Sequence, residues 1–175
     1  MLMTDPARIS DPLAAAERLP RGSAVVFRAF GAPDAIPQGR QLADIARRRS
    51  LFLLAGADPR LALAIGADGV HLPERLAHKA AAIRRAHPGW LVTVAAHGEA
   101  AARRARLCGA DAVVISPVFE SRSPSAERSL GPARFAGLVR AAGIPAYALG
   151  GVNVRTVARL KGSGAVGIAA VEALA

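Results

Sequence analysis

Short apolar runs alternate with amphipathic segments along the whole chain. The runs are rich in Ala, Val, Leu and Ile, as expected for parallel strands that are buried on both faces. They lie at residues 1–4, 24–30, 51–54, 69–72, 91–95, 112–116, 146–149 and 167–170. Segments with helical spacing lie between them, at residues 12–19, 38–49, 59–65, 76–86, 98–108, 132–141 and 154–161, and a last helix begins near Glu172. Eight strands, each followed by a helix, predict an α/β fold, a compact (β/α)8 TIM barrel.

A recurring turn supports this alternation. Residues 66–69, 109–112 and 164–167 each begin with Gly-Ala, close a helix and open a strand. No linker interrupts the pattern, so we expect residues 1–175 to form a single domain. The length of 175 residues is short for this barrel, which typically needs about 250 residues. A doubly wound open sheet is therefore the alternative architecture.

Charge and composition narrow the possible partners. The chain has 23 Lys and Arg against 13 Asp and Glu, a net charge of +10 that raises the question of nucleic-acid binding. The arginines are scattered over helical segments, and aromatic residues make up only 4% of the chain, so we expect no nucleic-acid partner. The single cysteine, Cys108, excludes a disulfide framework. No apolar run approaches the length of a membrane helix and the first residues do not resemble a signal peptide, which predicts a cytoplasmic protein without a membrane partner.

An ordered set of motifs resembles the thiamine phosphate synthase and thiazole tautomerase family. The set includes the Leu-Met-Thr-Asp run at 2–5, the Ala-Asp-Gly-Val-His-Leu run at 67–72 and the Ser-Pro-Val-Phe run at 116–119. It ends with Leu-Gly-Gly-Val-Asn at 149–153. The resemblance covers nearly the whole chain and implies a barrel that acts in thiamine biosynthesis. In that family the synthase joins a pyrimidine diphosphate to a thiazole phosphate and releases pyrophosphate.

The resemblance also implies a magnesium ion on the pyrophosphate, held by two acidic residues. In this chain the two matching positions are Ala57 and Leu76, which have no metal-binding atoms. Asp58 and Glu74 lie one and two residues away. Magnesium is therefore expected only if these two acids substitute for the missing ligands, and we assign no metal site.

Two further family patterns survive in part. In the Gln-x-Arg-x-Lys pattern of the second strand, only Arg28 remains. The catalytic histidine of the tautomerase branch aligns with Pro117. His97, at the end of the fifth strand, is the remaining candidate for an acid or base near neutral pH, although it is equally explained as a polar residue of the barrel rim. Arg28 and His97 are the candidate catalytic residues.

The expected phosphate site is better preserved. Gly150 and Gly151 follow the seventh strand and Gly167 lies near the eighth, so their backbone N–H groups are candidate anion donors. The family pattern Thr-x-Thr-Lys, which clamps phosphate, matches a run that begins Ser121-Arg122-Ser123. Glu172 argues against this site. It lies where the family often has serine, and its carboxylate would repel phosphate.

Two classes of function remain open. As an enzyme, the protein performs the synthase reaction with rearranged metal ligands, or a metal-free isomerisation with His97 as base. As a binding protein, it keeps the phosphate site without catalysis and acts as a carrier or regulator. In either case the expected partner is a small phosphorylated heterocycle similar to thiazole phosphate, and a homo-oligomer is left open.

Overall fold

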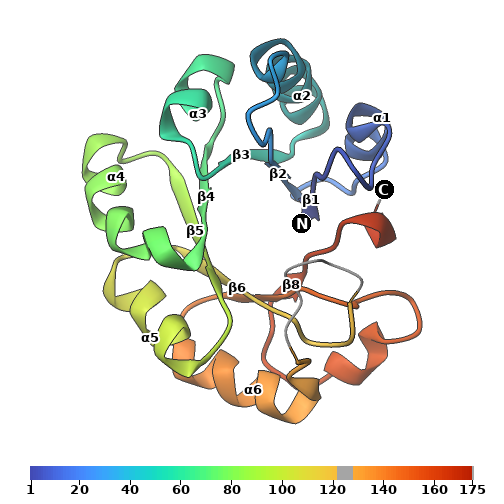
Figure 1. Ribbon diagram of the computed structural model, residues 1–175, viewed down its shortest axis with the longest axis vertical. Coiled ribbons are helices and arrows are strands. Elements are labelled where there is room, and N and C mark those ends of the chain that lie inside the picture. Colours follow the sequence, from blue (N-terminus) through green and yellow to red (C-terminus); the bar gives the residue numbers. More distant parts are fainter. Residues whose placement is uncertain (122–127, 175) are drawn as a thin grey trace.

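The chain folds into a barrel of eight parallel strands with helices around its outside (Figure 1). The computed structural model describes residues 1–121 and 128–174. The strands are β1 (Leu2–Met3), β2 (Ala24–Phe27), β3 (Phe52–Gly56), β4 (Gly69–Leu72), β5 (Leu91–Ala96), β6 (Ala112–Ile115), β7 (Ala146–Ala148) and β8 (Gly167–Ile168). The helices are α1 (Pro12–Glu17), α2 (Ala35–Arg49), α3 (Pro59–Ile65), the 3₁₀ helix η1 (Glu74–Lys79), α4 (Ala80–Ala86), α5 (Glu99–Leu107), α6 (Gly131–Ala142) and the 3₁₀ helices η2 (Val157–Leu160) and η3 (Glu172–Leu174).

Strand order shows that the sheet is the predicted barrel. Each strand pairs in parallel with its neighbour in sequence, from β1 to β8. A parallel bridge between Leu2 and Ala170, with the Met3 N–H donating to the Ala170 carbonyl at 2.8 Å, joins the first strand to the segment after β8. A doubly wound sheet would reverse its strand order at a switch point, so that alternative is wrong.

The repeated Gly-Ala-Asp turn has the same role at both of its positions. The Asp68 carboxylate accepts a hydrogen bond from the backbone N–H of Leu53 at 2.8 Å, at the start of β3. The Asp111 carboxylate accepts one from Val92 at 2.8 Å, at the start of β5. Each aspartate therefore accepts a hydrogen bond from an N–H group that would otherwise be unpaired at the amino-terminal end of a strand.

Two predicted elements are wrong in their extent. The second strand, expected at 24–30, ends at Phe27, and Phe30 adopts a left-handed backbone with φ 49°. The helix expected at 154–161 is reduced to η2. There the Thr156 hydroxyl donates to the Gly151 carbonyl at 2.9 Å and also accepts from the Asn153 N–H, so local side-chain bonds replace the helical ones. Val154, 91% exposed, adds no apolar face that would hold a helix on the barrel.

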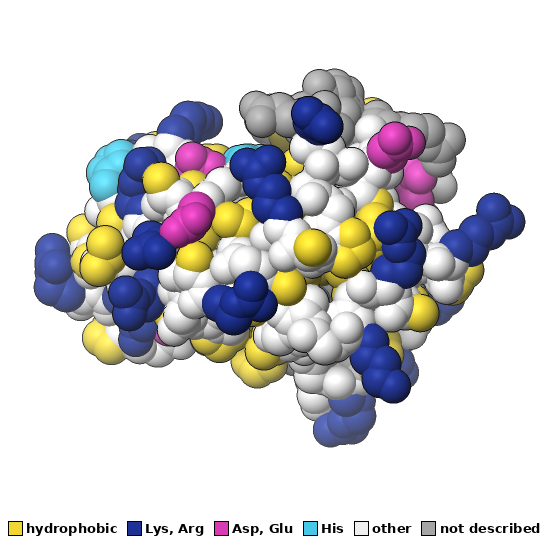
Figure 2. Space-filling view, turned by 90° about the horizontal axis from the view of Figure 1, so that it is seen from below, with side chains coloured by type: hydrophobic (Ala, Val, Ile, Leu, Met, Phe, Trp, Pro, Cys, Tyr) yellow, Lys and Arg dark blue, Asp and Glu magenta, His cyan; other side chains and the backbone are white. Residues whose placement is uncertain are grey.

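Most of the described arginines lie on the helices around the barrel. On the face shown in Figure 2 basic side chains are spread over the surface, with apolar, uncharged and some acidic side chains among them. Several are paired with acidic residues, among them Arg48 with Glu17 and Arg84 with Asp111. No helix within the described ranges 1–121 and 128–174 is long and apolar enough to cross a bilayer.

Candidate functional site

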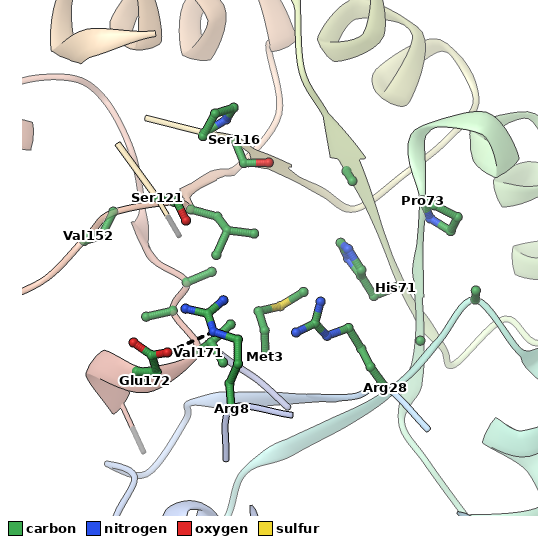
Figure 3. Close-up of a pocket in the computed structure, with 18 of the residues that line it drawn as sticks. Met3, Arg8, Arg28, His71, Pro73, Ser116, Ser121, Val152, Val171 and Glu172 are labelled. Atoms are coloured by element: carbon green, nitrogen blue, oxygen red, sulfur yellow. Dashed lines mark hydrogen bonds and ion pairs between the residues drawn. The ribbon is translucent and has the colours of Figure 1, made fainter. Parts of the chain in front are cut away.

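A cavity of about 710 Å³ opens at the carboxyl ends of the strands. All eight segments that follow the strands contribute to its lining. This is the end of a (β/α)8 barrel at which active sites are found. Figure 3 shows the side chains of Arg8, Arg28 and His71 pointing into this cavity from neighbouring segments. The fold therefore places a ligand-sized space where the sequence placed the candidate residues.

Arg28 is fixed at the cavity wall by three contacts with the segment after β1. Its Nε donates to the Thr4 carbonyl at 2.6 Å, and its Nη2 lies 3.3 Å from an Asp5 carboxylate oxygen. Its backbone N–H donates to the Thr4 hydroxyl at 2.9 Å. Burial lowers the pKa of the Arg28 guanidinium, Asp5 raises it, and nearby Arg8 lowers it. Arg28 is therefore a charged group that these contacts fix in place facing the cavity.

Arg8 is a site residue that the sequence analysis missed. It lies between β1 and α1, lines the cavity, and donates through Nε to Glu172 Oε1 at 2.9 Å. Nothing in the local sequence marks it, because its partner is 164 residues away. Glu172, expected to oppose phosphate, is thus ion-paired at the cavity edge (Figure 3).

His71 is buried where β4 meets the cavity. Its Nδ1 lies 2.9 Å from the Thr93 hydroxyl on β5. Burial, and to a lesser extent the positive charge of Arg28, lower the pKa of His71 to about 4. The ring is therefore neutral at physiological pH and offers the cavity a polar but uncharged group.

The two acids that were considered as substitute magnesium ligands have other partners. Asp58 caps helix α3, and its Oδ1 accepts from the backbone N–H groups of Arg60 and Leu61 at 2.9 and 3.0 Å. Glu74 Oε2 lies 2.9 Å from His97 Nδ1 and also accepts from the His97 backbone N–H. Within residues 1–121 and 128–174, no group of three or more His, Cys, Asp or Glu side chains is placed to hold a metal ion. The donor set does not fit the magnesium site that the resemblance implies.

The turn after β7 packs its main chain tightly against the segment after β6. Gly150 and Gly151 line the cavity with φ of +93° and +64°. A Cβ at Gly151 would overlap the Glu120 carbonyl oxygen and lie 2.7 Å from Phe119 Cβ. In the described parts of the chain, no hydrogen-bond acceptor is found for the N–H groups of Gly150, Gly151 or Val152. The turn thus places at the cavity backbone N–H groups that have no acceptor among residues 1–121 and 128–174.

The structure brings together most of the predicted site residues. Arg28, His97, Ser121, Gly150 and Gly151 all line the cavity. Arg122 and Ser123 lie outside the described residues.

Gly167 does not join these residues. It lies inside β8 beside the Tyr147 ring and does not line the cavity, because residues 169–173, beyond the strand, form this part of the wall.

These features define a class of protein: a (β/α)8 barrel with a ligand-sized cavity at the carboxyl ends of its strands. Its charged lining includes Arg8, Arg28 and Arg75, and its main-chain donors come from a double-glycine turn.

Sequence comparison identifies the family. A family model described as thiamine monophosphate synthase matches residues 1–174, and the chain belongs to this family. It is 30% identical over 133 residues to a putative thiamine-phosphate synthase 2 of Aquifex aeolicus, covering 76% of this chain and 71% of that protein. It is 32% identical over 174 residues to a thiamine-phosphate synthase of Herpetosiphon aurantiacus, covering 94% and 81%. Of four further relatives, the chain spans 54% to 64% of the length.

A solved structure shows the same fold. The thiamine phosphate pyrophosphorylase from Pyrococcus furiosus superposes with a TM-score of 0.83 at 23% identity, over 97% of this chain and 83% of that one. This likeness agrees with the barrel topology described above.

Proposed function

We propose that this member of the thiamine monophosphate synthase family binds a small phosphorylated heterocycle of the thiazole-phosphate kind in the cavity. The phosphate lies on the N–H groups of the Gly150–Gly151 turn, and Arg28 provides positive charge from the side of the second strand. The family membership gives the context of thiamine biosynthesis. The observation that carries the proposal is the double-glycine turn, whose main-chain donors have no acceptor among the described residues.

The chemistry of the lining supports a ligand bound without a metal. Backbone N–H groups and arginine guanidinium groups bind phosphate oxygens directly. The resemblance matches the magnesium positions of the family to Ala57 and Leu76, and the nearby acids Asp58 and Glu74 bond to other groups of the protein. We therefore favour binding, or a reaction that needs no divalent ion, over the synthase reaction.

A thermal-shift series tests this function. Thiazole phosphate, pyrophosphate and inorganic phosphate are each added with magnesium and with a chelator. A single-site ligand at 100 times its Kd stabilises the fold by about 2.7 kcal/mol, which is readily measured. We expect stabilisation by thiazole phosphate with chelator present. Stabilisation by pyrophosphate only with magnesium would support the synthase reaction instead, and no response to any phosphate would overturn the proposal.

One contact favours a metal-free isomerisation as the second candidate. The Glu74 carboxylate, 2.9 Å from His97 Nδ1, orients a ring that lines the cavity and is 42% exposed, as in histidines that transfer protons. The test is deuterium incorporation from D₂O into a bound thiazole phosphate. We expect exchange with the wild-type protein and none with His97→Gln. Equal exchange in both would exclude His97 as the base.

A further inference from the structure

The Arg8–Glu172 ion pair joins the two ends of the chain across the cavity edge. Arg8 is only 22% exposed at its side chain, whereas Glu172 is 42% exposed. Both line the cavity, and Figure 3 shows the Arg8 guanidinium between Glu172 and the open space. A carboxylate of the protein is therefore ion-paired with an arginine that lines the cavity.

Arg8 belongs to a local excess of positive charge. It is close enough to Arg28 to lower the pKa of that guanidinium, and Arg28 in turn acts on His71. Asp5 balances Arg28, and Glu172 balances Arg8. The two acids are held differently. Asp5 is 21% exposed and follows β1, whereas the more exposed Glu172 lies in the three-residue helix η3.

We propose that Glu172 is an exchangeable counter-ion for Arg8, and that an anionic group of the ligand binds by replacing the Glu172 carboxylate on the Arg8 guanidinium. This deepens the proposed function, on which it rests, and adds Arg8 as an anion receptor. The exchange is a competition between two anions for the Arg8 guanidinium, of which the Glu172 carboxylate engages Nε. A phosphate group brings more charge and more acceptor oxygens than the carboxylate, so it forms the stronger paired contact.

The Glu172 carboxylate can move into solvent when the ligand displaces it. Because the Glu172 side chain is 42% exposed, its carboxylate regains water when it leaves Arg8. The negative charge of Glu172 then opposes the binding of other anions at Arg8. It prevents weakly charged anions from occupying Arg8 and leaves the site to phosphate and pyrophosphate groups.

Calorimetric titration with thiazole phosphate and with pyrophosphate, in chelator, tests the exchange. Glu172→Gln keeps the side-chain shape and removes the competing charge, so we expect affinity to rise by roughly 3- to 10-fold. Arg8→Gln removes the receptor, and affinity should fall by roughly 10-fold or more. In the double variant the gain from Glu172→Gln should vanish, because Glu172 no longer competes at Arg8.

Matched controls separate this exchange from a general change in charge. Glu17→Gln removes the acid of another ion pair, with Arg48, and Arg85→Gln alters an exposed residue; neither residue lines the cavity, so both should leave affinity unchanged. Circular dichroism confirms folding, and Arg8→Lys replaces Arg8→Gln if the latter does not fold. We expect Arg8→Lys to weaken binding, because it loses the fork of donors.

Three results would overturn the exchange. Unchanged or weaker binding in Glu172→Gln shows that Glu172 does not compete, and unchanged binding in the Arg8 variant shows that Arg8 is no receptor. In both cases a wild-type protein that still binds phosphate leaves the proposed function intact. Absence of binding in the wild type removes the proposed function as well.

Discussion

His71 and Thr93 face each other across β4 and β5 as register partners, with His71 Nδ1 2.9 Å from the Thr93 hydroxyl. The ring is buried at the base of the cavity, next to the positive charge of Arg28. Both effects disfavour the imidazolium form and lower the pKa of His71 to about 4. The histidine thus contributes a fixed hydrogen bond and no charge.

This shift makes stability depend on pH in a defined window. The pKa of His71 is about 4 in the folded chain and 6.5 in the unfolded chain, so between these values the unfolded state binds more protons. The contribution of His71 is therefore complete above pH 6.5 and is lost as the pH falls toward 4. The loss is on the order of 3 kcal/mol by the bottom of that window.

Urea unfolding between pH 7.5 and pH 4 measures this dependence. His71→Gln should flatten the curve in that window, whereas His78→Gln, at an exposed position, should leave it unchanged. An identical pH dependence in wild type and His71→Gln would contradict the burial argument.

The double-glycine turn gives a second prediction. Gly151→Ala forces a Cβ against Glu120 and Phe119 at a left-handed φ, so we expect a loss of about 2–4 kcal/mol and no response to thiazole phosphate. Gly162→Ala is the matched control, with φ +77° and no atom within 4 Å of the added Cβ. It should lose only about 1 kcal/mol and keep the ligand response. The measurement is a thermal melt with and without ligand, and equal losses would show that crowding at Gly151 is unimportant.

Arg28 gives a third prediction. Arg28→Gln breaks the contacts to Thr4 and leaves Asp5 partly buried without its cation. We expect about 1–3 kcal/mol less stability and at least tenfold weaker phosphate binding. Arg104→Gln, on the exposed side of α5, controls for net charge. Chemical denaturation and calorimetry check the two effects, and a variant that matches wild type in both would remove Arg28 from the site.

A fourth prediction concerns Ala57, which lines the cavity after β3. Its φ of 62° is unfavourable for alanine, whereas asparagine tolerates this conformation. Ala57→Asn should therefore raise the free energy of unfolding by about 1 kcal/mol. The same change in the right-handed helix α5, Ala100→Asn, should lower it. A decrease in both variants would show that Ala57 is not strained.

The sequence predicted the barrel well because burial and turn chemistry are local signals. Apolar runs located all eight strands, and the repeated Gly-Ala turns located the points at which helices end. The predicted ends of two elements were wrong where side chains compete with the backbone for hydrogen bonds. Thr156 bonds to Gly151 and removes a helix, and Phe30 turns the chain away from β2.

The site was predictable only in part, for a physical reason. Gly150, Gly151 and Arg28 carry signals in their own sequence neighbourhoods. Arg8 does not, since it becomes a cavity residue only when barrel closure brings Glu172 beside it. Likewise, the engagement of Asp58 as a helix cap and of Glu74 with His97 depends on contacts that no spacing rule reveals.

In the proposed complex, main-chain N–H groups after β7 hold the phosphate of the ligand without a metal ion. A crystal structure of the chain with thiazole phosphate, grown in chelator, tests it most directly. We expect tetrahedral density within hydrogen-bond distance of the N–H groups of the Gly150–Gly151 turn. Density for the phosphate elsewhere in the cavity, or an empty cavity at ligand concentrations that saturate the protein in solution, would contradict the account.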